Sequence, residues 1–114
     1  MMLDWNEYQK QIAINTAQIG RANHLIIKGY RGLSEAGNAT NLLGAKVREL
    51  IALAVAVTRQ CDGCIVTHTD AAIKHGATKE EIVEALSVAV AVNAGAALIY
   101  SSRVMDAFSA KASL

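Results

Sequence analysis

Residues 48–68 read RELIALAVAVTRQCDGCIVTH, and this stretch decides the fold. After its first two residues the segment is apolar on all sides through Val57, so none of its helical faces is suited to water. The pattern predicts a central, buried helix over about residues 44–60. A further helix is predicted to begin at or near Cys61 and to end before Gly76, because glycine is common just beyond a helix C-terminus.

Helical patterns also precede this stretch. No proline interrupts the 114 residues, and alanine and leucine favour helix. Apolar residues at helical spacing predict helices over about residues 4–19 and 22–36, with Gly20 and Gly37 as their stops.

A capping-box pattern marks the next helix start. Thr78 is followed three residues later by Glu81, so each side chain can bond the other residue's backbone N–H. The Asn-Ala-Gly segment at 93–95 is expected to break or kink this helix, and a last helix is expected to run to about residue 110.

The fold class is therefore predicted to be all-α. We expect one domain over residues 1–114, built as an antiparallel array of about six helices, because the chain is too short for two ordinary domains. An apolar content of 53% with 18% charged residues excludes a disordered chain. A net charge of +1 without a Lys/Arg run excludes nucleic-acid binding.

The longest uncharged stretch, residues 85–102, approaches the length of a membrane span. It consists mostly of alanine and valine, however, and it includes Ser87, Asn93 and Ser101, so it has little bulky apolar surface for lipid. The chain carries more apolar residues than one small core needs. We expect the surplus to be buried between subunits rather than in a membrane.

The sequence also bears on the compartment. Asp4 and Glu7 interrupt the N-terminus before an apolar run can form, so no signal peptide is expected. Two cysteines in such a chain are not a disulfide framework. A reducing, cytoplasmic setting is therefore predicted.

The sharpest chemical feature is the C-x-x-C motif Cys61-Asp62-Gly63-Cys64. With Cys61 at a helix start, Cys64 lies one turn on, and the two sulfurs can close a disulfide. The positive end of the helix dipole favours the thiolate. His68 follows Cys64 by four residues, so the two side chains are helical neighbours and the imidazole can transfer the thiol proton.

Two residues near this motif admit more than one interpretation. His68 could instead be a helical histidine that bonds a backbone carbonyl. Glu49 stands at the margin of the apolar run, where partial desolvation would suit acid–base chemistry. Equally, Glu49 could be a solvated residue of the first helical turn, favoured there by the dipole.

A zinc site is the alternative for the same region. Cys61, Cys64, His68 and His75 are possible ligands, but four ligands from one short helix cannot readily surround an ion tetrahedrally. No metal is therefore expected, although a site shared between subunits stays open. His75, beside Gly76, is more simply explained as a partner of the helix C-terminus.

Taken together, several segments resemble the carboxymuconolactone decarboxylase family, and more closely its alkylhydroperoxidase D-like branch. The resemblance covers about residues 42–92. It rests on Arg48–Val55, on Cys61–His68, and on the helix break and start at Gly76–Thr78 and Glu80–Ile82.

The resemblance implies an all-helical homo-oligomer, a trimer or hexamer, that reduces hydroperoxides with thiols and uses no cofactor. Cys64 would attack the peroxide and become a sulfenic acid, and Cys61 would resolve it as a disulfide. An external dithiol, lipoyl-linked in the best-known members, would reduce that disulfide. His68 and Glu49 would form the proton relay.

One position departs from the family pattern. The best-known peroxidase of the branch has a second histidine directly before its second cysteine, where this chain has Gly63. The relay would then be shorter or run through water, and it stays open which cysteine attacks first. The alternatives are a lactone decarboxylase, which needs no C-x-x-C, and a non-catalytic redox-sensing oligomer.

Overall fold

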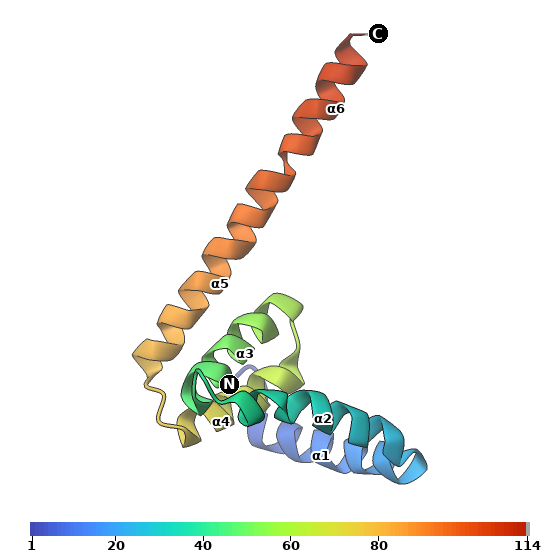
Figure 1. Cartoon of the computed structure of the whole chain (residues 1–114), viewed down its shortest axis with the longest axis vertical. Coiled ribbons are helices and arrows are strands. Elements are labelled where there is room, and N and C mark those ends of the chain that lie inside the picture. Colours follow the sequence, from blue (N-terminus) through green and yellow to red (C-terminus); the bar gives the residue numbers. More distant parts are fainter. Residues whose placement is uncertain (114) are drawn as a thin grey trace.

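Six helices make up the structure, a computed structural model that describes residues 1–113 (Figure 1). In chain order they are α1 (Trp5–Ala22), α2 (His24–Thr40), α3 (Ala45–Arg59), α4 (Asp62–Lys74), α5 (Lys79–Tyr100) and α6 (Ser102–Ala112). No strand occurs among the described residues. The all-α prediction with about six helices is confirmed.

The core lies where α3 packs against α4 and α5, and α1 covers α4 from another side. Five apolar residues are buried in it, namely Leu53, Ala56, Val66, Ala72 and Ala89. Three of the five are alanines, whose small side chains let neighbouring helices approach closely. The helix that carries the C-x-x-C motif is thus held between α1 and α3.

Side chains fix the helix starts as the sequence predicts. Asp4 accepts a bond from the backbone N–H of Glu7 at the start of α1, at 3.1 Å. The capping box of α5 is complete: Thr78 Oγ1 accepts from Glu81 N at 3.1 Å, and Glu81 Oε1 accepts from Thr78 N at 2.9 Å. These bonds satisfy backbone donors that a helix start leaves free.

The expected stops at Gly20 and Gly37 are wrong, because both glycines lie inside helices. Both serve close packing instead. A Cβ on Gly20 would lie 3.0 Å from Cγ1 of Ile27, and one on Gly37 would lie 2.7 Å from Cδ of Arg48. Close approach between elements therefore offsets the roughly 1 kcal/mol that an interior helical glycine costs.

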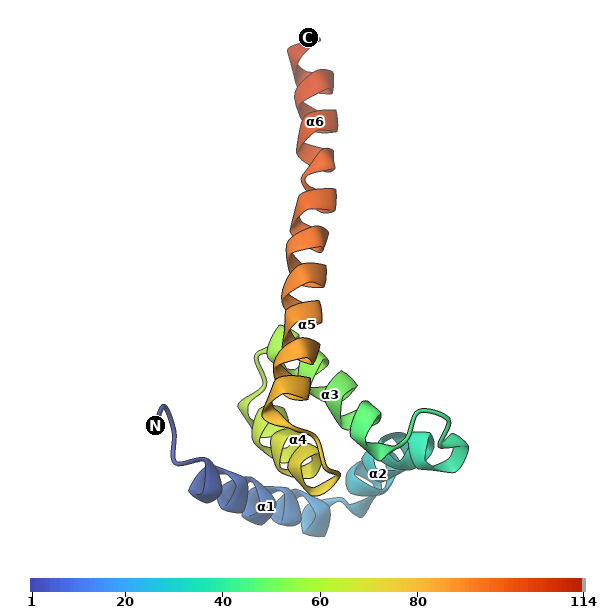
Figure 2. The same ribbon diagram turned by 90° about the vertical axis from the view of Figure 1, so that its left-hand side faces the viewer.

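The C-terminal third of the chain forms a long projecting arm, defined as α5 and α6 together. The expected break at residues 93–95 is wrong, since α5 runs through them without interruption. The Asn93 side-chain amide donates to Ala89 O at 2.7 Å and to Thr58 Oγ1 of α3 at 2.8 Å. Ser101 joins the two helices in a right-handed helical conformation. Figure 2 shows the arm extending straight away from the α1–α4 body.

The arm leaves much apolar surface uncovered in the single chain. The radius of gyration is 19.0 Å, against about 13 Å for a compact domain of 100 residues. By length and composition alone, the helix over Lys79–Ala112 could cross a membrane. The central helix α3 is also less enclosed than expected, because Ile51, Val55 and Val57 are exposed.

An ion pair ties the start of α5 to the start of α3. Lys46 Nζ lies 2.8 Å from Glu81 Oε2, and this bond, helped by the backbone N–H of Thr78, holds the pKa of the Glu81 carboxyl below its usual range. A carboxyl whose pKa is lowered in the folded state stabilises the fold at pH values above its ordinary pKa of about 4.3. This stabilisation is lost as the pH falls through the lowered pKa.

We therefore predict that Glu81→Gln lowers the midpoint of thermal unfolding at pH 7. Glutamine can still bond the backbone N–H of Thr78, so the loss reports the charge. The difference from the wild type should shrink as the pH falls below about 4. The control is Glu84→Gln, which makes the same change in charge one turn along, outside the capping box. A difference that persists unchanged at low pH would contradict the prediction.

Candidate active site around Cys61 and Cys64

A sharp reversal between α3 and α4 positions the two cysteines. Gln60 ends α3 in the left-handed conformation with a φ of 52°, and Cys61 is the N-cap of α4. The Cys61 Sγ accepts a bond from the backbone N–H of Cys64 at 3.2 Å. The two residues are joined by a disulfide across a Cα–Cα distance of 5.2 Å. The expected helix start at the motif is confirmed.

Glu49 and His68 are brought together from α3 and α4. His68 Nδ1 lies 2.6 Å from Glu49 Oε2, and the side chains are only 31% and 21% exposed. The structure supports the interpretation of Glu49 as a partly buried residue rather than a solvated one, and the Glu49 carboxylate bonds His68. Because an ionised carboxylate only accepts, Nδ1 donates the proton of this bond, and Nε2 is the ring nitrogen left for other partners.

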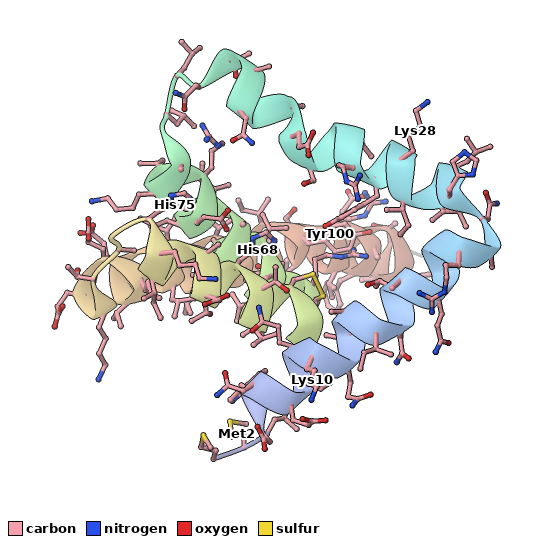
Figure 3. The ribbon with its side chains drawn as sticks, turned by 90° about the horizontal axis from the view of Figure 1, so that it is seen from below. Met2, Lys10, Lys28, His68, His75 and Tyr100 are labelled. Atoms are coloured by element: carbon pink, nitrogen blue, oxygen red, sulfur yellow. A yellow bond between two sulfur atoms is a disulfide. The ribbon has the colours of Figure 1, made fainter. Side chains whose placement is uncertain are left out.

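The active-site side chains share one face of α4. At 100° per residue, Cys64, His68 and His75 fall within a narrow sector of the helix. Figure 3 shows the disulfide beside His68, with His75 further along the helix. His75 is the C-cap of α4, as expected from its place before Gly76.

The possible zinc ligands do not gather around one point. The two sulfurs are bonded to each other. Within residues 1–113, no group of three or more His, Cys, Asp or Glu side chains is placed to hold a metal ion.

Two cavities flank α4 on different sides. The apolar groove, of about 400 Å³, lies between α1 and α4 and is lined by residues such as Trp5, Gln9, Ile65 and Ile73. The polar pocket, of about 380 Å³, is lined by Ser34, Asn38, Ala45, Arg48, Glu49, Ala52, His68 and His75. Of these two cavities, only the polar pocket is lined by both Glu49 and His68.

Sequence reasoning missed most of the polar pocket. Ser34 and Asn38 come from α2, which is predicted from its pattern alone to have ended before Asn38. No spacing signal connects them with the C-x-x-C motif, so only the folded arrangement reveals the pocket.

The comparisons with known proteins define the class of protein. The sequence pattern of the carboxymuconolactone decarboxylase family matches residues 26–107. The chain belongs to this family.

Relatives of similar length carry names without an assigned activity. An uncharacterized protein of Haemophilus influenzae is 41% identical over 109 residues, which is 96% of each chain. A protein of Cupriavidus necator is 34% identical over 81% of each chain. "Uncharacterized protein 4 in cox locus" of Paracoccus denitrificans is 36% identical over 77% of this chain and 79% of its own length.

A solved structure is similar over nearly the whole chain. It is the apo crystal structure of a carboxymuconolactone decarboxylase family protein from Legionella pneumophila, with a TM-score of 0.74 and 33% identity. The match covers 92% of this chain and 94% of the other. The match leaves out only a small part of this chain, whereas the arm makes up 34 residues, so most of the arm falls within the matched part.

The structure explains why the motif holds a glycine where the best-known peroxidase has histidine. A Cβ on Gly63 would lie only 2.9 Å from Cδ1 of Ile12, a residue of α1. The Ile12 side chain of α1 therefore lies close over this point of α4, and a histidine here would have to displace it.

We predict that Gly63→His lowers the free energy of unfolding by about 1–3 kcal/mol, the usual cost of overpacking. Gly63→Ala should cost less, because the crowding atom is the flexible end of Ile12. Adding Ile12→Ala to Gly63→His should recover part of the loss by making room. Denaturant unfolding measures all four proteins, and a fully stable Gly63→His variant would show that α1 does not cover the motif in solution.

Proposed function

We propose that this chain is a thiol-dependent peroxidase, or more broadly a disulfide reductase, with Cys61 and Cys64 as its redox pair. The observation that carries the proposal is the joint arrangement of the pair at the start of α4 and of His68, one helical turn from Cys64 and held by Glu49. Membership in the carboxymuconolactone decarboxylase family supports it.

In the proposed first step, the reduced Cys64 thiolate attacks the peroxide ROOH. The O–O bond breaks, a bond forms between Sγ and oxygen, and the leaving alkoxide takes a proton to become ROH. His68 supplies this proton from Nε2 after accepting it from the Cys64 thiol, while Glu49 stabilises the imidazolium between the two transfers. Cys64 is left as a sulfenic acid.

In the second step, Cys61 resolves the sulfenic acid. The Cys61 thiolate attacks Cys64 Sγ and expels hydroxide, which leaves as water after taking up a proton, and the disulfide closes. The N-cap position, with the N–H of Cys64 directed at the Cys61 sulfur, favours this thiolate. An external dithiol then exchanges with the disulfide, so that one ROOH and one dithiol become ROH, water and a new disulfide.

We predict that Cys64→Ser abolishes peroxide-dependent oxidation of an added dithiol. Cys61→Ser should still consume one equivalent of peroxide and stop at the sulfenic acid, because nothing resolves it. The assay supplies a panel of dithiols, lipoamide included, and follows peroxide loss. Undiminished turnover in Cys64→Ser would refute the assignment. Lactone turnover that is insensitive to thiol alkylation would instead indicate a decarboxylase, and stoichiometric oxidation without turnover a redox sensor.

We further propose that the protein works as a homo-oligomer, a trimer or hexamer, in the cytoplasm, where reduced dithiols are available. The arm supports this: Val90, Leu98 and Phe108 are each more than 65% exposed in the single chain. At its base lies an apolar groove of about 260 Å³ between α3 and α5, lined by residues such as Val55, Val88 and Val92. A second copy of the chain would cover both surfaces.

Light scattering at micromolar concentration without detergent should therefore give a mass several times the 12.1 kDa of one chain. Leu98→Asp should shift the distribution toward the monomer, because it places a charge on an apolar surface that assembly buries. Lys111→Gln, which changes the charge by the same amount at an exposed position on another side of the same arm, should leave the mass unchanged. A monomeric wild-type protein would contradict the proposal.

A further inference from the structure

Arg48 lines the same polar pocket as the Glu49–His68 pair. We infer that this pocket binds a carboxylate group, and that the peroxide reduced here is an organic hydroperoxide that carries one. The identification of the substrate class rests on the proposed peroxidase function, whereas the carboxylate site itself does not.

The charge of Arg48 is positioned but not neutralised. Its Nη1 donates to Asn41 Oδ1 and its Nη2 to Asn38 Oδ1, both at 2.8 Å. Both acceptors are neutral amides. The ion pairs among the described residues are Lys46–Glu81, His68–Glu49 and Lys74–Asp70, and none of them includes Arg48.

The pocket leaves donors available for a ligand. A guanidinium has five N–H donors, and two of those of Arg48 are engaged by the amides. The stem of Arg48 lies against Gly37, where a Cβ would come within 2.7 Å of its Cδ, so the side chain is held in place before a ligand arrives. A fixed guanidinium matches a carboxylate, which it can bind through two parallel bonds.

The other side chains of the pocket are compatible with an anion. Glu49 is the only acidic side chain in the lining, and its carboxylate is engaged by His68. Ser34 and His75 add further polar groups to the same cavity. Its volume of about 380 Å³ lies within the range of small-molecule sites, roughly 300–1,000 Å³.

The geometry also sets the length of the ligand. The α3 and α4 helices are joined by a short reversal, so Glu49, the residue after Arg48, meets His68 in the middle of α4, while Arg48 and His75 line the same pocket. At 1.5 Å per residue, Cys64 lies roughly 6 Å along α4 from His68 and roughly 16 Å from His75. A carboxylate at Arg48 and a peroxide at Cys64 would thus be separated by an alkyl chain of several carbons, as in a hydroperoxy fatty acid.

The test compares the hydroperoxide of linoleic acid with that of its methyl ester, which differ only in the carboxylate. We expect the wild-type kcat/KM to be at least about tenfold higher for the acid, and Arg48→Gln to lower it about tenfold for the acid alone. Arg21→Gln, at an exposed arginine in the last turn of α1, is the matched control. If the wild type and Arg48→Gln prefer the acid over the methyl ester by the same ratio of kcat/KM, the inference is overturned.

A second variant separates charge from structure. Asn38→Asp keeps an oxygen that accepts from Arg48 but neutralises the guanidinium, so it should remove the preference for the acid while leaving the thermal stability unimpaired. If Asn38→Asp keeps the full preference, the guanidinium is not the binding group.

Calorimetric titration with octanoate distinguishes this inference from the proposed function. Octanoate binding that is lost in both Arg48→Gln and Asn38→Asp supports the carboxylate site even if no peroxide is reduced. Absence of octanoate binding together with reduction of neutral cumene hydroperoxide overturns the carboxylate site and leaves the peroxidase proposal standing.

Discussion

The bond between His68 and Glu49 is the interaction on which the rest of the site depends. It joins α3 to α4 at 2.6 Å and sets the tautomer of the imidazole. The same bond orients His68 on the face of α4 that carries Cys64, one turn away, and keeps the only acidic side chain of the polar pocket engaged. Without it, the imidazole would be free to rotate and Glu49 would meet any incoming anion with an unpaired charge.

Packing makes this bond possible, and small residues make the packing possible. Ala56 and Ala72, both buried, let α3 and α4 approach until two polar side chains can meet across them. The cost is a small core, because a chain with five buried apolar residues leaves most of its apolar surface uncovered. Part of that surplus lies along the arm, whose apolar composition explains why this stretch resembles a membrane span.

Local sequence rules predicted the helix starts well and the helix ends poorly. Thr78, Glu81 and Cys61 act through bonds to backbone groups within three residues, so their patterns are readable from the chain. Gly20 and Gly37 look like stops, but their role is set by side chains from other elements, which no local rule contains.

The site was predictable to the same extent. The spacing of Cys61, Cys64 and His68 shows from the sequence alone that they lie on successive turns of one helix. The bond between Glu49 and His68 depends on how α3 packs against α4, which the sequence does not show. Arg48 could not be recognised as a pocket residue, because its partners Asn38 and Asn41 are fixed by the longer course of α2 and a left-handed residue at its end. The arm is likewise a consequence of a helix that does not break at Asn93.

The most direct test of the central claim counts thiols and peroxide together. Fully reduced protein is mixed with one equivalent of cumene hydroperoxide without a reductant, and both are measured. The account predicts that each chain consumes one peroxide and loses both thiols as an intramolecular disulfide, and that an external dithiol restores them for another turnover. Peroxide consumption that leaves both thiols free, or no reaction with peroxide at all, would contradict it.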